Sequence, residues 1–130
     1  NGDKRDVIFT DVGYGLNDTK PVVINLFTRY MAQSFLMSLD TKNADDWAIQ
    51  LSNNPGQWIG SEEYVSGGTC SGDSGSPTLF GGPESNLIVG VHNAGIMPAC
   101  TGYGISWRVD IAESLDFIAG VVEAYGLELP

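Results

Sequence analysis

The alternation of apolar and polar positions along the chain predicts mainly short strands. Residues 7–15 (VIFTDVGYG) form a β-prone run that ends in glycines, and residues 47–52 and 105–109 have the same character. The apolar runs 77–80 and 86–93 flank the turn sequence GGPES, which predicts a β-hairpin.

The last part of the chain has the pattern of a helix. Asp110 is a good N-cap residue, and Glu113 follows three positions later, as in a capping box. Apolar side chains that share one helical face come next, at Ile111, Leu115, Ile118 and Val122. We therefore expect a helix over residues 110–125.

Three further segments are less regular. Residues 22–39 fit a helix almost as well as strands, because several apolar residues follow helical spacing. Residues 17–21 predict a turn, and 53–66 predict a long loop in which Trp58 and Tyr64 are exposed or docked over a pocket rim. The acidic segment 40–46 lacks the glycine and terminal glutamate of an EF-hand loop, so we interpret it as a solvated turn rather than a calcium site.

Composition limits the class of protein. A chain of 130 residues suits one domain with a modest core, and 42% apolar residues with 17 glycines suit a turn-rich protein. The net charge of −10 argues against nucleic acid or an anionic membrane as a partner. No apolar run is long enough to span a membrane, and the N-terminus has no signal-peptide pattern, so we interpret the chain as a processed product or a fragment.

The candidate chemistry lies in residues 67–80, GGTCSGDSGSPTLF. Ser74 directly follows Asp73, and the glycines on both sides of this pair let the backbone turn sharply and leave the hydroxyl unobstructed. Ser74 is the candidate nucleophile, and the N–H groups of Gly72 and Ser74 are candidate oxyanion donors. A lone GDSG would also suit a surface loop, but the extended run TCSGDSGSP favours a functional site.

This motif resembles the GDSGGP or GDSGSP nucleophile motif of trypsin/chymotrypsin-like serine peptidases. The resemblance covers essentially all of residues 1–130, as the second barrel of a two-barrel enzyme. It implies an all-β fold, an antiparallel six-stranded Greek-key barrel with a C-terminal α-helix, in which residues 22–39 are strand. It also implies that Ser74 is acylated. Asp73 would be a structural acid, which in activated members pairs with a newly cut N-terminal ammonium.

The two cysteines, Cys70 and Cys100, are far apart in the sequence. Alone they would fit two buried thiols, but the resemblance implies a disulfide that links the nucleophile loop to the far wall of the specificity pocket. Closing such a loop is worth about 3.5 kcal/mol, and a disulfide suits an oxidising compartment. We therefore expect a secreted protein. The sequon at Asn17 would matter only in a eukaryotic secretory route.

The resemblance places the pocket for the residue before the scissile bond between residues 67–71, 91–95 and 102–106. Trypsin-like enzymes that bind Arg or Lys have an aspartate six residues before the nucleophile, where this chain has Gly68. A tryptic specificity is therefore not expected.

His92 is the only histidine, and its surroundings, VGVHNAG, resemble the segment of glutamyl endopeptidases that places a histidine in the pocket wall. Thr69 falls where those enzymes have a hydroxyl residue that helps to hold the substrate carboxylate. Both side chains can donate hydrogen bonds to a carboxylate, whose charge also raises the imidazole pKa. We expect a preference for Glu, or Asp, before the cut. Two alternatives stay open: a structural histidine bonded to a backbone carbonyl, and a general base for Ser74, which the family geometry opposes.

Two positions depart from the family pattern. Asn93 stands where a serine usually contacts the triad aspartate, although an amide can also bind a carboxylate. Ala94 replaces an aromatic residue that walls the neighbouring subsite. The backbone from Asn93 to Gly95 is expected to align the substrate as an added strand.

A serine peptidase needs a base and an acid that orients the base. The resemblance implies that an N-terminal barrel, as a separate chain or segment, carries the catalytic His and Asp. We therefore expect the nucleophile-bearing half of a secreted serine endopeptidase that acts on peptide or protein substrates, with no cofactor and no metal. The alternatives are a non-catalytic peptide-binding domain and an inactive fragment.

Overall fold

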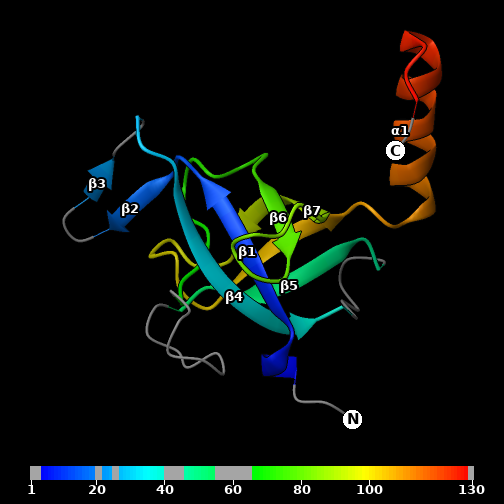
Figure 1. Ribbon diagram of the computed structural model, residues 1–130. Helices are drawn as coiled ribbons and strands as arrows, with labels where there is room; N and C mark the ends of the chain where they lie inside the picture. The colour runs from blue at the N-terminus through cyan, green and yellow to red at the C-terminus, as the bar shows by residue number, and fades with distance from the viewer. Residues whose placement is uncertain (1–3, 20–21, 25–26, 40–45, 55–65, 129–130) are drawn as a thin grey trace.

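A computed structural model describes residues 4–19, 22–24, 27–39, 46–54 and 66–128. The fold is mostly β, and six strands close into an antiparallel barrel that is followed by one α-helix (Figure 1). The all-β barrel with a C-terminal helix that the sequence predicts is thereby confirmed.

The barrel strands follow one another in a Greek-key arrangement. Around the barrel the order is β1-β4-β5-β8-β7-β6, and β6 pairs back onto β1. Strands β6, β7 and β8 are consecutive neighbours, while β5 lies beside β8, at the far side of that group from β6. The bounds are β1 (Ile8–Gly13), β4 (Tyr30–Ser38), β5 (Ala48–Ser52), β6 (Pro77–Phe80), β7 (Ile88–Gly95) and β8 (Tyr103–Arg108).

Residues near the start of the chain form a small separate sheet as well as a 3-10 turn, η1 (Lys4–Asp6). Strand β2 (Leu16–Thr19) pairs with β3 (Val22–Ile24), so the turn predicted for 17–21 is wrong at residues 17–19. Asn and Asp have turn chemistry, but here the pairing with β3 provides backbone partners.

The segment 22–39 contains strands, not a helix. Besides β3 it includes β4, which pairs with β1 from Ile8↔Phe35 to Gly13↔Tyr30. Helical spacing of a few apolar residues is a weak signal, and pairing with a neighbouring strand outweighs it. The predicted strands at 47–52, 77–80, 86–93 and 105–109 are also confirmed, with ends that differ by a few residues.

The inside of the barrel has two chemically different halves. The apolar half consists of Phe9, Ile49 and Leu51, against which Val7, Leu36 and Val89 pack. The polar half consists of five buried side chains on the same strands and their neighbours: Asp11, Ser34, Thr78, His92 and Ser106. Because side chains alternate between faces, Phe9 and Asp11 lie on the same face of β1 and mark the boundary between the halves.

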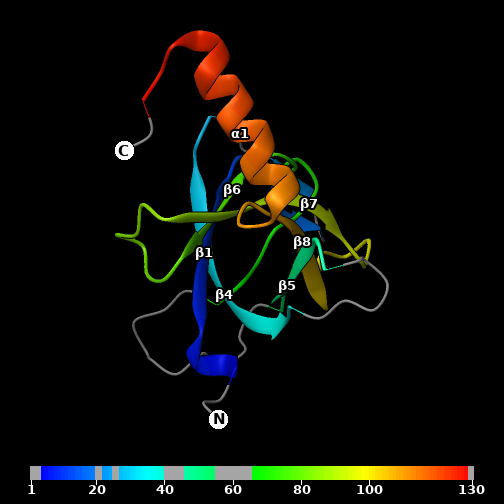
Figure 2. The same ribbon diagram turned by 90° about the vertical axis from the view of Figure 1, so that its right-hand side faces the viewer.

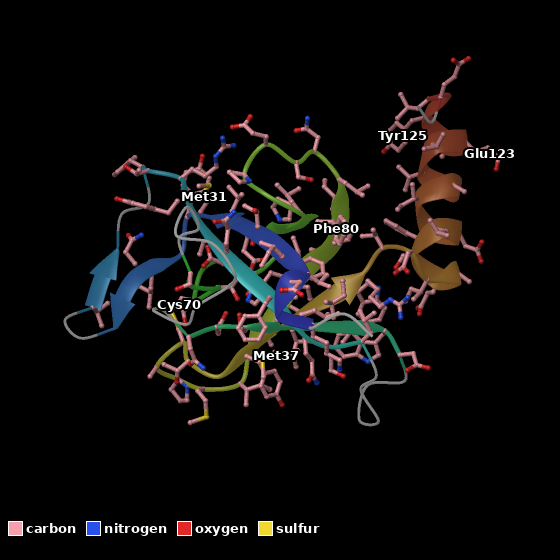
Figure 3. The ribbon with its side chains drawn as sticks, turned by 60° about the horizontal axis from the view of Figure 1, so that its bottom comes forward. Met31, Met37, Cys70, Phe80, Glu123 and Tyr125 are labelled. Atoms are coloured by element: carbon pink, nitrogen blue, oxygen red, sulfur yellow. A yellow bond between two sulfur atoms is a disulfide. The ribbon has the colours of Figure 1, made fainter. Side chains whose placement is uncertain are left out.

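The C-terminal helix α1 (Ala112–Tyr125) extends away from the barrel (Figures 1 and 2). None of its side chains is buried, and Leu115, on the predicted apolar face, is 52% exposed. Tyr125 lies near its far end and is 77% exposed (Figure 3). The helix ends at Gly126, whose φ of 61° is the left-handed conformation that glycine adopts readily.

The start of the helix corrects the predicted cap. Ile111, not Asp110, is the N-cap residue, and no side chain caps the helix. Asp110 instead accepts two hydrogen bonds from Arg108, at 2.8 and 2.7 Å, because a bidentate guanidinium is a stronger partner than one exposed backbone N–H. Ser114 ties the first turn to the barrel, since its hydroxyl accepts from Trp107 Nε1 at 2.9 Å and donates to the Arg108 carbonyl at 2.7 Å.

Some predictions fall on residues outside the described ranges. These are most of the acidic segment 40–46 and the part of the loop that carries Trp58 and Tyr64. In the described ranges, the helices are too short or too polar to cross a membrane.

Candidate functional site

The turn that carries Ser74 is tight and depends on glycine. Asp73 N–H donates to the Cys70 carbonyl at 3.1 Å, and Ser76 N–H donates to the Asp73 carbonyl at 2.9 Å. Gly72 has a φ of 102°, which side chains rarely tolerate. A Cβ at Gly72 would also lie 3.0 Å from the Gly15 Cα. The sequence therefore needs glycine at this position for both conformation and space.

The Asp73 carboxylate joins this turn to the region between β1 and β2. Its Oδ1 accepts from Gly15 N–H at 2.8 Å, and its Oδ2 accepts from Cys70 N–H at 2.9 Å. A Cβ at Gly15 would lie 2.6 Å from this carboxylate, so the approach is possible only for glycine. Asp73 thus stabilises the turn through two backbone amides.

Ser74 is exposed, and its hydroxyl donates to the main-chain carbonyl of Asn93 at 3.4 Å. This carbonyl is not a base that can remove the hydroxyl proton. Within the described ranges, the N–H groups of Gly72 and Ser74 take no part in the backbone hydrogen bonds that close the turn. Their role as oxyanion donors stays a prediction.

A cavity of about 280 Å³ lies beside Ser74. Two of the three predicted wall segments contribute to its lining, through residues 69–71 and through His92, Ala94 and Gly95. The third predicted segment, 102–106, does not line it. Residues 96–98 and Cys100 complete the wall instead.

Gly68 and Asn93 are two further residues of the predicted pocket, and Gly68 lines the larger cavity. Neither lines the smaller cavity. Gly68 lies against Asn53, because a Cβ at Gly68 would come within 2.7 Å of the Asn53 Cα. The absence of an aspartate at this position therefore also has a steric reason. Asn93 contacts Ser74 through its carbonyl, and its side chain is exposed.

His92 is 4% exposed and belongs to the wall of the smaller cavity. Its main-chain N–H donates to the Ser76 carbonyl, and its carbonyl accepts from Gly75 N–H, both at 2.8 Å. In the side chain, Nδ1 is buried and has no hydrogen-bond partner within the described residues. Burial lowers the pKa of His92, whereas the negative charge of Asp73 acts to raise it.

Thr69 and His92, the two residues predicted to hold a substrate carboxylate, lie on either side of Gly104. A Cβ at Gly104 would be 2.9 Å from Thr69 Oγ1 and 3.5 Å from His92 Cε1. The fold therefore brings these two side chains together, and Gly104 provides the space between them.

Asn53 holds Thr69 in place, and the sequence analysis missed it. Its Nδ2 donates to the Thr69 carbonyl at 2.7 Å, while its Oδ1 accepts from Thr69 N–H at 2.8 Å. Asn53 is 2% exposed, so these bonds are buried. The sequence signal for this role is weak, because an asparagine that follows a strand is normally interpreted as a turn or loop residue.

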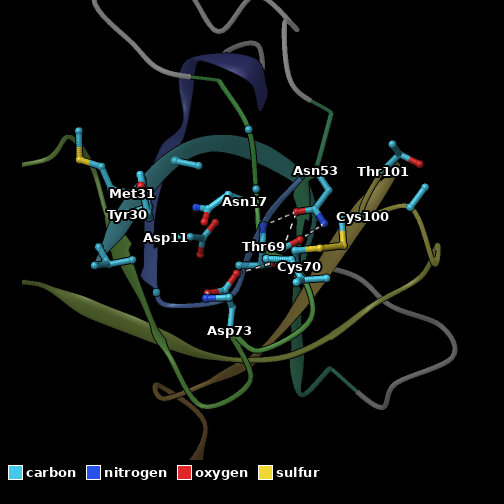
Figure 4. A pocket seen from close by; sticks show the side chains of 18 residues that line it. Asp11, Asn17, Tyr30, Met31, Asn53, Thr69, Cys70, Asp73, Cys100 and Thr101 are labelled. Atoms are coloured by element: carbon cyan, nitrogen blue, oxygen red, sulfur yellow. Dashed lines mark hydrogen bonds between the residues drawn. A yellow bond between two sulfur atoms is a disulfide. The ribbon is translucent and has the colours of Figure 1, made fainter. Parts of the chain in front are cut away.

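Cys70 and Cys100 form a disulfide with a Cα–Cα distance of 5.1 Å, which confirms the predicted pairing. With Thr69, they line both the smaller cavity and a larger one of about 620 Å³ (Figure 4). The disulfide is therefore part of a wall between two cavities. It also favours an oxidising compartment.

Asp11 lies in the larger cavity and was not singled out by the sequence analysis (Figure 4). Its Oδ1 accepts from Thr78 Oγ1 at 2.9 Å, and its Oδ2 accepts from Ser34 Oγ at 3.1 Å. Burial raises the pKa of Asp11 to about 6; the two hydrogen bonds oppose this, and the charge of Asp73 adds to it. The available signal was its inward position on β1, two residues after Phe9.

No group of three or more His, Cys, Asp or Glu side chains that could hold a metal ion occurs in the ranges that the structure describes. No protein-family model matches the sequence, and a comparison with curated proteins found no match. A proposal about function therefore rests on the geometry around Ser74 and on the motif that contains it.

Proposed function

We propose that this chain is the nucleophile-bearing half of a trypsin-like serine endopeptidase. The observation that carries the proposal is the turn at Ser74. An exposed hydroxyl follows an aspartate whose carboxylate accepts from two backbone amides, and it lies at the edge of a cavity that contains Thr69 and His92. The six-stranded Greek-key barrel and the disulfide agree with this class of enzyme.

The proposed reaction is acyl transfer. Ser74 Oγ attacks the peptide carbonyl carbon while a histidine takes the hydroxyl proton and passes it to the leaving amine. The N–H groups of Gly72 and Ser74 stabilise the oxyanion, and each donor is worth about 10²-fold to 10³-fold in rate. Water then attacks the acyl-enzyme and releases the carboxylic acid. No cofactor is required.

The base comes from another barrel in this proposal. In the described residues, the hydrogen bond of Ser74 Oγ is to a main-chain carbonyl, and His92 contributes to the pocket wall. An N-terminal barrel with the catalytic His and Asp would complete the site. The substrate would lie along β7 near Asn93 and Gly95 as an added strand.

The proposed specificity is for Glu or Asp before the cut. Thr69 and His92 both line the smaller cavity, and both can donate to a carboxylate. Burial of the ring lowers the pKa of His92. A bound carboxylate would raise this pKa and favour the imidazolium. The acidic side chain of the substrate would thus induce the positive charge on His92 that binds it.

The test uses the protein in its native form. An intact-mass spectrum under denaturing conditions should reveal a second chain or a longer polypeptide that includes a further barrel. The native material should then cleave peptides after Glu, and Ser74→Ala in the complete protein should lower kcat/KM by about 10⁴-fold or more. Full activity of the Ser74→Ala variant would refute the proposal.

A second experiment addresses specificity alone. His92→Val in the complete protein should lower kcat/KM for a glutamyl peptide by about 10-fold to 100-fold, because a charged hydrogen bond is lost. The same variant should change cleavage of a matched glutaminyl peptide much less. Equal losses for both peptides would exclude a carboxylate-binding role for His92.

A non-catalytic peptide-binding domain is the second candidate. It is favoured by the hydrogen bond of Ser74 Oγ to Asn93, because a hydroxyl held by a carbonyl is not activated. Calorimetry with a glutamyl peptide distinguishes the two functions. Binding with no turnover by the complete native protein would support this candidate over the peptidase.

A further inference from the structure

Asn53 contacts Thr69 through both ends of its side-chain amide (Figure 4). Its Nδ2 donates to the Thr69 carbonyl at 2.7 Å, and its Oδ1 accepts from the Thr69 N–H at 2.8 Å. The Thr69 hydroxyl lies 3.4 Å from the same Oδ1. Both residues are at most 4% exposed. Asn53 thus fixes the position of a residue that lines the smaller cavity.

The backbone of Thr69 determines which way the Asn53 amide faces. A main-chain N–H can only donate and a carbonyl can only accept, so Oδ1 must face the N–H and Nδ2 must face the carbonyl. The atom beside the Thr69 hydroxyl is therefore an acceptor, and the hydroxyl proton points to it. In this arrangement Thr69 Oγ1 presents only lone pairs to a ligand in the smaller cavity.

A ligand carboxylate can take over this hydroxyl proton as a hydrogen bond at small cost. O–H···O bonds are typically about 2.7–2.8 Å long, so the contact at 3.4 Å is weak. A hydroxyl bond to a charged oxygen is shorter and about twice as strong as a neutral one. When the hydroxyl turns to the ligand, Asn53 Oδ1 keeps its bond from the Thr69 N–H. The exchange therefore replaces a long neutral bond by a short charged one.

The fold leaves room at the hydroxyl and holds the main chain beside it. A Cβ at Gly104 would lie 2.9 Å from Thr69 Oγ1 and 3.3 Å from Asn53 Oδ1, so glycine keeps this space open. The Asn53 N–H donates to the Gly102 carbonyl at 3.0 Å. The hydroxyl proton can thus change its direction while the backbone and the amide stay in place.

We propose that Asn53 is a positioning residue for recognition of a carboxylate in the smaller cavity. It holds the main chain of Thr69 and keeps the hydroxyl proton on a weak, neutral acceptor, from which an acidic ligand can take it. This role rests on the proposed preference for Glu or Asp before the cut. It adds that selectivity depends on a neutral amide at position 53, which lines the larger cavity, as well as on Thr69 and His92.

An aspartate at position 53 would have almost the same shape but the opposite effect. Its carboxylate would hold the Thr69 hydroxyl proton through a charged hydrogen bond, and its charge would repel a second carboxylate nearby. Asn53→Asp should therefore weaken the binding of acidic ligands far more than that of neutral ones. If Asn53 only supported the main chain of Thr69, the variant would weaken the binding of both kinds of ligand equally.

The experiment measures the binding of N-acetylglutamate and N-acetylglutamine to the complete native protein by calorimetry. The two ligands differ only in the side-chain carboxylate, and a mildly alkaline buffer favours the ionised form of the ligand and of the new aspartate. Wild-type protein should bind N-acetylglutamate at least about 10-fold more tightly. Asn53→Asp should lower this ratio by about 10-fold or more.

Two pairs of variants provide the controls. Asn54→Asp adds the same charge one residue later, at a side chain whose Oδ1 accepts from Gly102 N–H at 2.7 Å, and should change the ratio much less. Thr69→Val removes the hydroxyl at nearly constant shape and should lower the ratio, whereas Thr69→Ser should keep it. ¹H–¹⁵N spectra check that each variant is folded.

One measurement needs no variant. When the hydroxyl turns to a carboxylate, the Thr69 N–H no longer shares Asn53 Oδ1 with it, so this hydrogen bond should become stronger. N-acetylglutamate should therefore shift the Thr69 amide proton of the wild-type protein downfield, and N-acetylglutamine should shift it much less.

Three results would overturn the inference: equal affinity of the wild-type protein for the two ligands, equal losses for both ligands in Asn53→Asp, or a Thr69 amide signal that does not respond to N-acetylglutamate. The last result applies even where a variant fails to fold. None of them bears on whether Ser74 is a nucleophile, which the cleavage assay with Ser74→Ala decides. Carboxylate binding that depends on Asn53 in a protein without cleavage would support this inference and refute the peptidase.

Discussion

The apolar and polar halves of the barrel interior share the same strands but differ in what they stabilise. β1 contributes Phe9 to one half and Asp11 to the other. In the apolar half, burial of side chains lowers the free energy of the folded state directly. In the polar half, burial is unfavourable and hydrogen bonds offset it. The candidate site around His92 belongs to the polar half.

This difference suggests a division of roles within one small domain. The apolar half should determine most of the stability, since it contains the buried hydrophobic cluster of the described residues. The polar half should contribute less to stability, because its buried groups depend on hydrogen bonds to offset the cost of burial. Substitutions in the two halves should therefore change the free energy of unfolding by different amounts, and these changes should depend differently on pH.

The largest expected effect is in the apolar half. Phe9→Ala should lower the free energy of unfolding by about 4 kcal/mol, because it removes a 4% exposed ring and leaves a cavity. Urea denaturation measures the loss. Phe80, which makes an edge contact with Phe9 but is 48% exposed, provides the control, and Phe80→Ala should cost much less. Equal losses would argue against an apolar half centred on Phe9.

The next effect is the pH dependence caused by Asp11. Its pKa is raised from 3.8 to about 6, so between these values the folded protein binds more protons than the unfolded chain. The free energy of unfolding should therefore fall as pH rises through this window, by about 3 kcal/mol in total. Asp11→Asn should remove this part of the slope. If the free energy of unfolding had the same pH dependence in both proteins, the raised pKa of Asp11 would be contradicted.

A smaller loss is expected at Asn53, which lines the larger cavity. Asn53→Ala leaves the N–H and carbonyl of Thr69 without their partner, and should cost about 2 kcal/mol. The Thr69 amide should also exchange faster with solvent deuterium. Asn54 offers a neighbouring control, because its side chain accepts one hydrogen bond from Gly102 N–H and is only half-buried. A larger loss of stability for Asn54→Ala than for Asn53→Ala would contradict this prediction.

The smallest effect is expected outside the interior. Asp110→Ala breaks the ion pair with Arg108, in which the aspartate side chain is 63% exposed. Such pairs contribute less than about 1 kcal/mol, and salt screens them. Chemical denaturation should show a small loss relative to wild type at low salt, and this loss should shrink at high salt. A loss as large as that of Phe9→Ala would mean that α1 is essential to the barrel.

The fold followed from the sequence because most of its signals are local. The hairpin around GGPES and the strand at 47–52 are encoded in short segments, whereas the resemblance was needed to interpret 22–39 as strand. The N-cap at Asp110 was wrong because a nearby Arg108 competes for the carboxylate, and a capping pattern does not include that competitor.

The site was only partly accessible from the sequence. The turn at Ser74 and the disulfide were predicted from one motif and its resemblance. Asp11 and Asn53 were missed because their partners, Thr78 and Thr69, come from distant parts of the chain. A single polar residue in a strand, or directly after one, is not marked by any sequence pattern. Only the closed barrel shows that these side chains contact their partners.

The main-chain bonds of His92 have a consequence for engineering. Its N–H and carbonyl pair with Ser76 and Gly75, the residues that follow Ser74. The side chain at position 92 and the Ser74 hydroxyl are thus attached to one backbone ladder, and these main-chain bonds involve no atom of the side chain at position 92. A library of substitutions at this single position should therefore vary the chemistry of the cavity wall while the main-chain geometry of the turn at Ser74 is kept.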